Sequence, residues 1–177
     1  MPVTVALIGN PNTGKSTLFN ALAGVRQRTG NYPGVTVEKK EGRLTIDGRP
    51  FVIVDLPGTY SLAPPSPDEM VAVDVLLGRQ REVPPPDMVL CIVDASNLER
   101  NLYLVSQVLE LGRPTVIAVN MVDVAESRGL KLDLDRLERQ LGVPLVPVQA
   151  HRKIGIDRLS AALAQVQPDA RMAPTSP

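Results

Sequence analysis

The sequence of 177 residues predicts an α/β fold with a six-stranded, mainly parallel sheet, one antiparallel edge strand and helices on both faces. Short apolar runs rich in Val and Ile recur along the chain, and segments of helical period separate them. This alternation is typical of strands joined by crossover helices. A hydrophobic content of 44% is enough for the core of one domain of this size. We therefore expect one domain over residues 1–167 and a proline-rich tail or truncated linker over 168–177.

The expected strands lie over 3–8, 37–46, 50–55, 88–94, 115–120 and 144–148. Between the second and the third of them, Asp47-Gly48 is a two-residue hairpin signal, so this pair should be antiparallel. The charged run Glu-Lys-Lys-Glu at 38–41 suits an exposed edge strand.

The expected helices carry clear end signals. Ser66, Pro67 and Glu69 are typical of an N-cap, a first helical position and a capping box, and Gly78 ends this helix. A second helix follows from apolar residues at spacings of four and three, which should pack in the core: Leu98, Leu102, Val105 and Leu109. Further helices are expected near 16–24, 133–141 and 155–166, and the proline-rich stretches at 64–65, 84–86 and 168–177 should be loops or tail.

Composition excludes several classes of partner. Nineteen basic residues balance nineteen acidic ones, so no global field favours nucleic acid or an anionic membrane, and we expect no nucleic-acid partner. No apolar run approaches the roughly 18 residues of a membrane-spanning helix, and the first residues do not resemble a signal peptide. The single cysteine, Cys91, lies in an apolar run and is expected to be a buried core residue rather than a reactive thiol.

A phosphate-loop motif, G-x-x-x-x-G-K-S, occupies residues 9–16, after a predicted strand and before a predicted helix. Glycines allow the backbone N–H groups to wrap phosphates, and the helix directs its positive end at them. Lys15 should reach the β- and γ-phosphates, and the Ser16 hydroxyl should ligate Mg²⁺. A chance match in a glycine-containing loop is the alternative. The predicted phosphate-binding residues are Gly9, Asn10, Pro11, Asn12, Thr13, Gly14, Lys15, Ser16 and Thr17.

A base-reading motif, N-x-x-D, follows the strand over 115–120. Asp123 can accept both N1–H and the exocyclic amine of guanine, whereas adenine lacks that amine. Taken alone, Asp123 could instead be a helix N-cap. A second base loop follows the last strand, where Gln149 replaces the usual serine and His151 is expected to be an exposed loop residue. The predicted base-binding residues are Asn120, Met121, Asp123, Val148, Gln149 and Ala150.

Two further motifs predict sensing of the γ-phosphate. In the D-x-x-G element Asp55-Leu56-Pro57-Gly58, Asp55 would hold Mg²⁺ through water and the Gly58 N–H would contact the γ-phosphate. Thr36, in Gly34-Val35-Thr36, is the candidate switch threonine that ligates Mg²⁺ when GTP is bound. Together the motifs predict a Ras-like P-loop GTPase that binds GTP or GDP with Mg²⁺. Thr59 stands where Ras-like enzymes have a glutamine, so intrinsic hydrolysis should be slow.

Three segments between these motifs are similar to the ferrous-iron transport protein B (FeoB) family: 31–38, 55–62 with 66–69, and 98–104. The resemblance runs from about Val3 to Leu163. It implies a full protein in which this domain acts, through a helical regulatory domain, on a membrane domain that moves ferrous iron. The domain would then lie on the cytoplasmic side of the bacterial inner membrane.

The resemblance also implies a potassium ion, held by the Asn12 side chain and residues 31–34 where an arginine finger would otherwise lie. The alternative is that Asn12 only stabilises the loop. The residues expected to act in hydrolysis are Lys15, Thr36, Gly58 and Asn12. Two other functions remain open: a non-catalytic GTP/GDP sensor, and a ribosome-assembly or tRNA-modification GTPase, against which the neutral charge counts.

Overall fold

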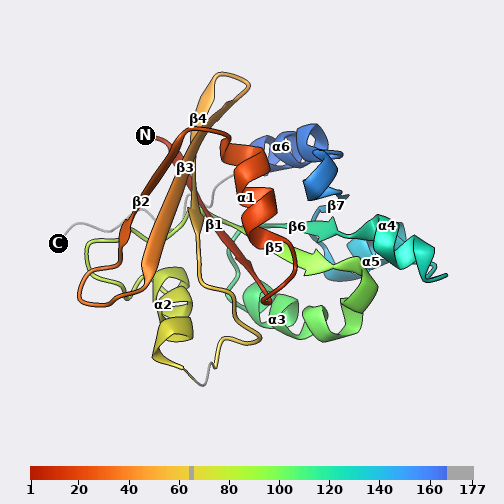
Figure 1. Ribbon diagram of the computed structural model, residues 1–177, viewed down its shortest axis with the longest axis horizontal. Helices are drawn as coiled ribbons and strands as arrows, with labels where there is room; N and C mark the ends of the chain where they lie inside the picture. Colours follow the sequence, from red (N-terminus) through yellow and green to blue (C-terminus); the bar gives the residue numbers. More distant parts are fainter. Residues whose placement is uncertain (64–65, 167–177) are drawn as a thin grey trace.

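The computed structural model describes residues 1–63 and 66–166. In this part of the chain one sheet of seven strands has the order β2-β3-β4-β1-β5-β6-β7, with helices on both of its faces (Figure 1). The strands are β1 (Val3–Gly9), β2 (Gln27–Asn31), β3 (Glu38–Ile46), β4 (Arg49–Asp55), β5 (Met88–Asp94), β6 (Thr115–Asn120) and β7 (Leu145–Pro147). The helices are α1 (Lys15–Ala23), α2 (Pro67–Leu76), α3 (Leu98–Glu110), α4 (Val122–Ser127), α5 (Leu134–Leu141) and α6 (Ile156–Gln165), with single 3₁₀ turns η1 (Ala95–Asn97) and η2 (Ala150–Arg152).

β1 lies at the centre of the sheet and pairs in parallel with both β4 and β5. β6 and β7 continue the parallel part on the β5 side. Because helices cover both faces of these strands, their residues are buried on both sides, and β5 is apolar throughout except at its last residue. Cys91 on β5 is 1% exposed, which confirms the predicted core position.

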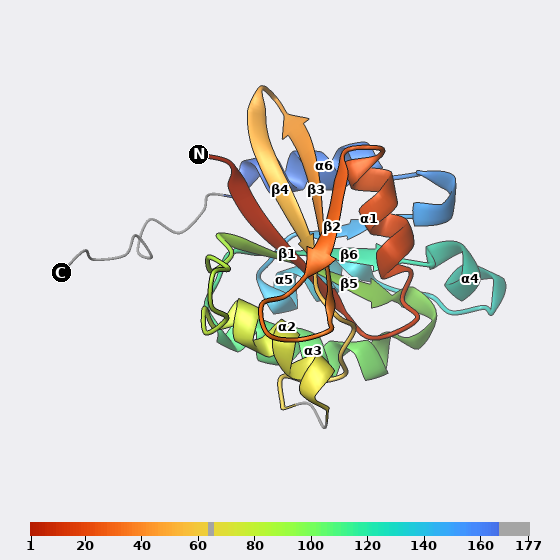
Figure 2. The same ribbon diagram turned by 60° about the vertical axis from the view of Figure 1, so that its left-hand side comes forward.

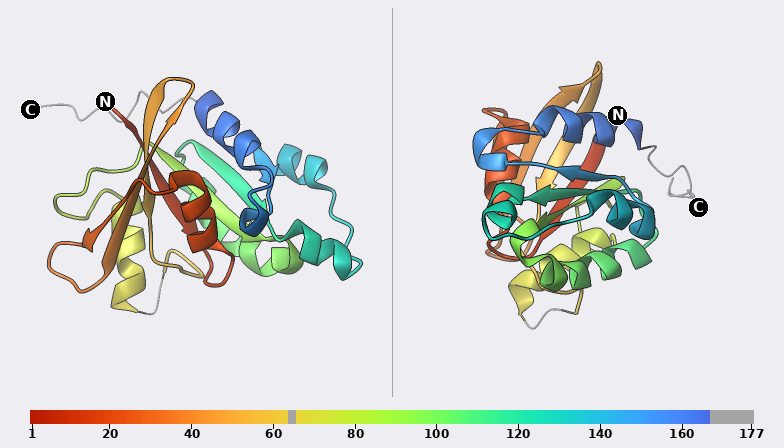
Figure 3. Two further views of the ribbon diagram at one scale, coloured as in Figure 1. Left: turned by 45° about the horizontal axis from the view of Figure 1, so that its top comes forward. Right: turned by 90° about the vertical axis from the view of Figure 1, so that its right-hand side faces the viewer.

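Two hydrophobic cores lie on opposite faces of the sheet. One packs α1 and α6 against the sheet, around Phe19 and Leu159, and the other packs α2 and α3, around Leu76 and Leu104. Figures 2 and 3 show these two helix layers from the side. The predicted fold class is therefore confirmed: a mostly parallel sheet with an antiparallel region at one edge and helices on both faces.

The number of strands and the identity of the edge strand differ from the prediction. The structure adds β2, which pairs antiparallel with β3, so β3 lies between β2 and β4 and is not the edge. The sequence of β2, Gln-Arg-Thr-Gly-Asn, has no apolar side chain, and all five residues are exposed. No hydrophobic alternation was therefore present to predict it.

The predicted turn and helix ends agree with the structure. Asp47 and Gly48 have φ of 50° and 76° and connect the antiparallel pair β3–β4, as a type I′ hairpin requires. The Ser66 hydroxyl accepts a hydrogen bond from the Glu69 backbone N–H at 3.3 Å, so α2 begins with the predicted cap. The predicted loop at 64–65 and tail at 168–177 fall outside the described residues.

Helix α4 was not predicted, and it contains only six residues. Its N-cap, Met121, has φ 62°, a left-handed conformation that non-glycine residues seldom adopt. Among residues 1–63 and 66–166, no helix combines the length and the apolar character needed to cross a bilayer.

Candidate functional site

The phosphate loop connects the carboxyl end of β1 to α1, at the centre of the sheet (Figure 1). A Cβ at Gly9 would lie 2.5 Å from Ile92 Cγ2, so β1 and β5 approach closely only because this residue has no side chain. Gly14 has φ +87°, and a Cβ there would collide with the Asn120 side chain. Both motif glycines are therefore required by backbone geometry and close packing, which favours a built site over a chance match.

Asn120, at the end of β6, connects three loops through its side chain. Its amide Nδ2 donates to the Thr13 carbonyl at 3.0 Å, and its Oδ1 accepts from the Ala150 N–H at 3.1 Å. Asn120 is 3% exposed, so these are buried hydrogen bonds. The structure thus brings the predicted phosphate loop and both predicted base loops together around one side chain.

Asp123 lies in the first turn of α4, and the N-cap position belongs to Met121. The alternative interpretation of Asp123 as an N-cap is therefore wrong. Asp123 Oδ1 and Gln149 Oε1 are buried oxygens that have no hydrogen-bond partner among the described residues. Two such acceptors suit the N–H donors of a guanine base, and each is costly to bury without a donor.

His151, in η2, lies beside the carboxylate that is predicted to read the base. Its Nε2 is 3.7 Å from Asp123 Oδ2, and its side chain is 54% exposed. The prediction of an exposed loop histidine is confirmed, but the contact with Asp123 was missed. These residues are 28 positions apart in the sequence, and only the fold brings them together. Val148, by contrast, is buried in the core.

Lys15 and Asp55 form an ion pair at the phosphate end of the site, through Nζ and Oδ1. Their side chains are 12% and 9% exposed. Ser16 and Thr17 are exposed in the first turn of α1, beside this pair. Oxygen donors of the kind that Mg²⁺ prefers, a hydroxyl and a carboxylate, therefore lie close to the phosphate loop.

The D-x-x-G element is attached to β1 and to the phosphate loop. The Leu56 N–H donates to the Leu7 carbonyl at 3.0 Å, and the Thr59 N–H donates to the Gly9 carbonyl at 3.0 Å. Gly58 lies so close to Pro11 that a Cβ at Gly58 would be 3.3 Å from it. The structure therefore places Asp55, Leu56, Pro57 and Gly58 next to the phosphate loop, as predicted from the motif.

The structure does not bring Thr36 to this site. Gly34, Val35 and Thr36 are exposed in the β2–β3 connection, which lies apart from the phosphate loop in Figures 1 and 3. No described hydrogen bond links Thr36 to the phosphate loop. The role of Thr36 stays a prediction that requires movement of this connection.

Tyr32 anchors the β2–β3 connection and was not predicted to lie in the core, although it falls within residues 31–34, which the family resemblance assigned to a potassium ion. It is 1% exposed, and its hydroxyl has no hydrogen-bond partner among the described residues. Burial raises the pKa of the Tyr32 phenol above its usual range, and the charges of Asp55 and Glu41 raise it further. In the sequence, a tyrosine before Pro33-Gly34 gives only a turn signal, so nothing indicated that this ring would be in the core.

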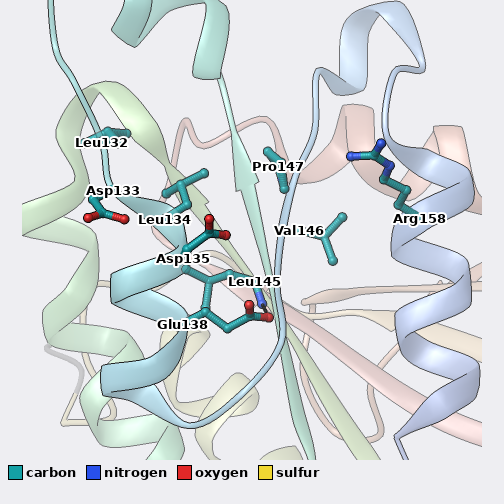
Figure 4. A pocket seen from close by; sticks show the side chains of 9 residues that line it. All are labelled: Leu132, Asp133, Leu134, Asp135, Glu138, Leu145, Val146, Pro147 and Arg158. Carbon is teal, nitrogen blue, oxygen red and sulfur yellow. Dashed lines mark hydrogen bonds between the residues drawn. The ribbon is translucent and has the colours of Figure 1, made fainter.

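Two pockets differ in their relation to these residues. A polar pocket of about 140 Å³ adjoins the phosphate loop and is lined by Asn10, Pro11, Asn12, Thr13, Tyr60, Asp94, Asn97, Arg100 and Asn101. A wider pocket of about 490 Å³ lies between α5, β7 and α6, with acidic side chains on one side of β7 and Arg158 on the other (Figure 4). None of the predicted nucleotide-binding residues lines the wider pocket.

Comparisons with known proteins identify the family of this chain. The family model described as Ferrous iron transport protein B matches residues 3–163. The Fe(2+) transporter FeoB of Salmonella typhimurium is 48% identical over 165 residues, which cover 91% of this chain and 21% of that protein. The FeoB of Escherichia coli K12 is 47% identical with the same coverage. The chain thus spans about a fifth of the length of these relatives.

Solved structures show the same fold. The cytosolic domain of L. pneumophila FeoB has a TM-score of 0.87 and 47% identity, over 94% of this chain and 70% of that one. The FeoB G-domain from Methanococcus jannaschii has a TM-score of 0.79 and 46% identity, over 93% of this chain and 97% of that one. A mutant of S. thermophilus NFeoB bound to GDP has a TM-score of 0.84 and 46% identity, over 94% of this chain and 63% of that one. This chain therefore belongs to the ferrous iron transport protein B (FeoB) family and has the fold of its G domain.

Proposed function

We propose that residues 1–167 form a domain that binds GTP and GDP with Mg²⁺ and hydrolyses GTP. The observation that carries this proposal is the pair of buried hydrogen bonds by which Asn120 joins the phosphate loop to the second base loop, beside the unpartnered Asp123 Oδ1. One nucleotide can then be recognised at its base and its phosphates together. Structures of relatives bound to GDP support this proposal.

Guanine selection is tested most directly at Asp123. A carboxylate accepts the two N–H donors of guanine, whereas the side-chain amide of an Asp123→Asn variant can donate to the 2-carbonyl of xanthine. We expect calorimetry to show GTP and GDP binding but no comparable ATP binding, and Asp123→Asn to transfer binding to xanthosine nucleotides. Equal binding of ATP and GTP by the unmodified protein would overturn the proposal.

At the phosphate end, Lys15 would leave Asp55 and contact the β- and γ-phosphates, and the Gly58 N–H would contact the γ-phosphate. Ser16 and Asp55, joined by Thr36 after movement of the β2–β3 connection, would supply oxygen donors for Mg²⁺, which would neutralise charge on the phosphate oxygens. Thr59 is fully buried, and its hydroxyl donates to the Ser61 carbonyl at 2.7 Å. This hydroxyl is therefore not free to orient a water molecule, so the intrinsic rate should be slow.

We also propose that potassium stimulates hydrolysis through Asn12. The Asn12 side chain is exposed on the phosphate loop, where its carbonyl oxygen could ligate a monovalent cation beside the phosphates. GTP turnover should then be much faster in KCl than in NaCl, and Asn12→Ala should remove the difference. Equal rates of the unmodified protein in both salts would remove the support for this role.

For the full-length protein, we propose that this domain lies on the cytoplasmic side of the bacterial inner membrane. There it would act as a nucleotide switch that drives or gates the uptake of ferrous iron. A helical regulatory domain and a membrane domain would be its partners. The identity to Fe(2+) transporters supports this proposal, and the family match does not favour a ribosome-assembly or tRNA-modification role. The test is Fe²⁺ uptake by cells that carry the full-length protein with Asp123→Asn. Uptake at the unmodified rate would contradict a nucleotide switch.

A non-catalytic sensor remains the second candidate, because Thr59 supplies no group that orients water. Single-turnover measurements separate the two. Release of phosphate from bound GTP that is no faster in KCl with Mg²⁺ than in free solution would favour the sensor.

A further inference from the structure

We propose that Arg100 and Gln107, both on α3, are positioning residues that hold residues 59–62 so that Gly58 stays against the phosphate loop. Held in this way, the Gly58 N–H is ready to contact the γ-phosphate. The inference rests on the proposed function, since it concerns the discrimination of GTP from GDP by that same site.

The first contact is between Arg100 and Tyr60. The guanidinium carbon of Arg100 lies 4.5 Å from the centroid of the Tyr60 ring, within the range of a cation–π interaction. Arg100 forms no ion pair among the described residues, so its charge is free to interact with the ring. Both side chains also line the polar pocket that adjoins Asn10 and Asn12, which places this contact directly beside the phosphate loop.

The second contact is between Gln107 and the backbone at Leu62. Gln107 Oε1 accepts a hydrogen bond from the Leu62 N–H at 2.7 Å. Gln107 follows Arg100 by seven positions, about two helical turns, so both side chains project from the same face of α3. Helix α3 therefore binds residues 59–62 at two points, one near each end of the segment.

On its other side, the segment is bound to β1. The Thr59 N–H donates to the Gly9 carbonyl at 3.0 Å, and Gly58 lies against Pro11. The segment is thus held between the end of β1 and α3. Because Gly58 directly precedes the segment, loss of the α3 contacts should let Gly58 move away from the phosphate loop. Only GTP has the phosphate that Gly58 would contact, so the cost should fall on GTP and not on GDP.

The experiment compares dissociation constants for GDP and for a non-hydrolysable GTP analogue, both with Mg²⁺, in the 177-residue protein and its variants. A cation–π contact of this kind corresponds to about two- to fivefold in an equilibrium constant. Arg100→Ala and Tyr60→Ala should therefore each lower the affinity for the analogue about two- to fivefold and leave GDP binding unchanged. Tyr60→Phe keeps the ring, so it should retain the original ratio of the affinity for the analogue to the affinity for GDP.

Two further variants separate positioning from a general effect on α3. Tyr103→Ala removes a tyrosine ring from α3 itself, 60% exposed, and should leave the ratio of the two dissociation constants unchanged. Gln107→Leu removes the acceptor for the Leu62 N–H and should lower the ratio, whereas Gln107→Glu keeps an acceptor and should restore it. The double variant Tyr60→Ala with Arg100→Ala should be no worse than either single variant, because both remove the same contact.

Each other result overturns the inference. If Arg100→Ala weakened GDP and the analogue equally, Arg100 would act on the phosphates by its charge and not through Tyr60. If Arg100→Ala, Tyr60→Ala and Gln107→Leu left the ratio of analogue affinity to GDP affinity unchanged, or raised it, the α3 contacts would not prepare Gly58 for the γ-phosphate. Failure of the unmodified protein to bind either nucleotide would overturn the proposed function itself, and would thereby be distinguished from failure of the positioning role.

Discussion

The loops around Asn120 and the β2–β3 connection represent opposite ways of attaching a candidate site to the same sheet. Asn120 is 3% exposed, and its buried hydrogen bonds join the phosphate loop to the second base loop. In the β2–β3 connection, Thr36 is exposed, whereas Tyr32 is in the core. The described hydrogen bond that reaches residues 33–36 from outside the connection is a long one, 3.5 Å from Gln80 Nε2 to the Pro33 carbonyl.

This difference corresponds to a difference between ligands. The base, the ribose and the first two phosphates are common to GDP and GTP, and the buried loops around Asn120 would bind that common part. The γ-phosphate is present only in GTP, and the exposed connection carries the threonine proposed to respond to it. A segment with few buried contacts has a low free energy of local opening, which is what a switch requires.

Thiol reactivity should show the largest contrast between the buried sheet that carries the Asn120 loops and the exposed β2–β3 connection. Burial raises the pKa of the Cys91 thiol from an ordinary value near 9 to about 12, which lowers its thiolate fraction about a thousandfold. We expect Cys91 to resist alkylation at pH 8 in the folded protein, and a cysteine introduced by Thr36→Cys to react at the rate of an exposed thiol. Rapid labelling of the unmodified protein would show that the β5 region opens readily.

The same thiol adds a pH dependence to stability. An unfolded cysteine ionises near pH 8.5–9, whereas the folded thiol does not ionise until about pH 12. Well below about pH 8.5 both states are protonated, so the contribution of Cys91 to the free energy of unfolding does not vary. Between about pH 9 and 12 the unfolded state loses its proton first, so stability should fall. Cys91→Ala should reduce this slope in denaturant titrations.

Asn120→Ala should have the next largest effect. It leaves the Thr13 carbonyl and the Ala150 N–H buried without partners, so the free energy of unfolding should fall by about 2–4 kcal/mol. Affinity for GDP and for a GTP analogue should fall together, because the loops that are proposed to bind their common part would separate. The control is Asn97→Ala, whose side chain is exposed. A loss confined to the analogue would contradict the assignment of Asn120 to the common part.

Thr36→Ala should lower the affinity for a GTP analogue alone, whereas Asn120→Ala should lower the affinity for both nucleotides. The side chain is exposed, so the free energy of unfolding should change by no more than about 0.5 kcal/mol. Loss of the hydroxyl that is proposed to ligate Mg²⁺ should lower the affinity for a GTP analogue with Mg²⁺ about tenfold and leave the affinity for GDP unchanged. Thr36→Ser keeps the hydroxyl and should bind normally. Equal loss for both nucleotides would place Thr36 outside a γ-phosphate switch.

His151→Ala should have the smallest effect. A contact of 3.7 Å at a side chain that is 54% exposed contributes little, so GDP affinity should change by less than about fivefold. Lys153→Ala, in the same exposed loop, serves as the comparison. A loss of GDP affinity as large as that of Asp123→Asn would show that His151 itself binds the base.

The buried parts of this molecule were the most predictable from sequence. β5 and β6 were predicted to the residue, because continuous apolar runs of Val and Ile are typical of strands covered on both faces. The phosphate loop was predictable for a related reason. Its glycines meet local steric demands at Gly9 and Gly14, and those demands appear directly in the sequence as a motif.

The exposed and nonlocal features were not predictable. β2 has no apolar face, and α4 is short and begins from a left-handed methionine, so neither carries a periodic signal. The contact of Arg100 with Tyr60 joins residues 40 positions apart, and the contact of His151 with Asp123 joins residues 28 apart. Such pairs depend on how helices and turns pack over the sheet, which no local pattern encodes.

The Lys15–Asp55 ion pair has a consequence for the order of ligand entry. Each partner neutralises the other in a position where the side chains are almost out of water. A magnesium ion arriving alone would have to displace an ammonium group from the Asp55 carboxylate, and free phosphate would have to displace that carboxylate from Lys15. A magnesium–nucleotide complex brings a cation for Asp55 and phosphate for Lys15 at the same time. Binding of the complex should therefore be favoured over binding of either component alone.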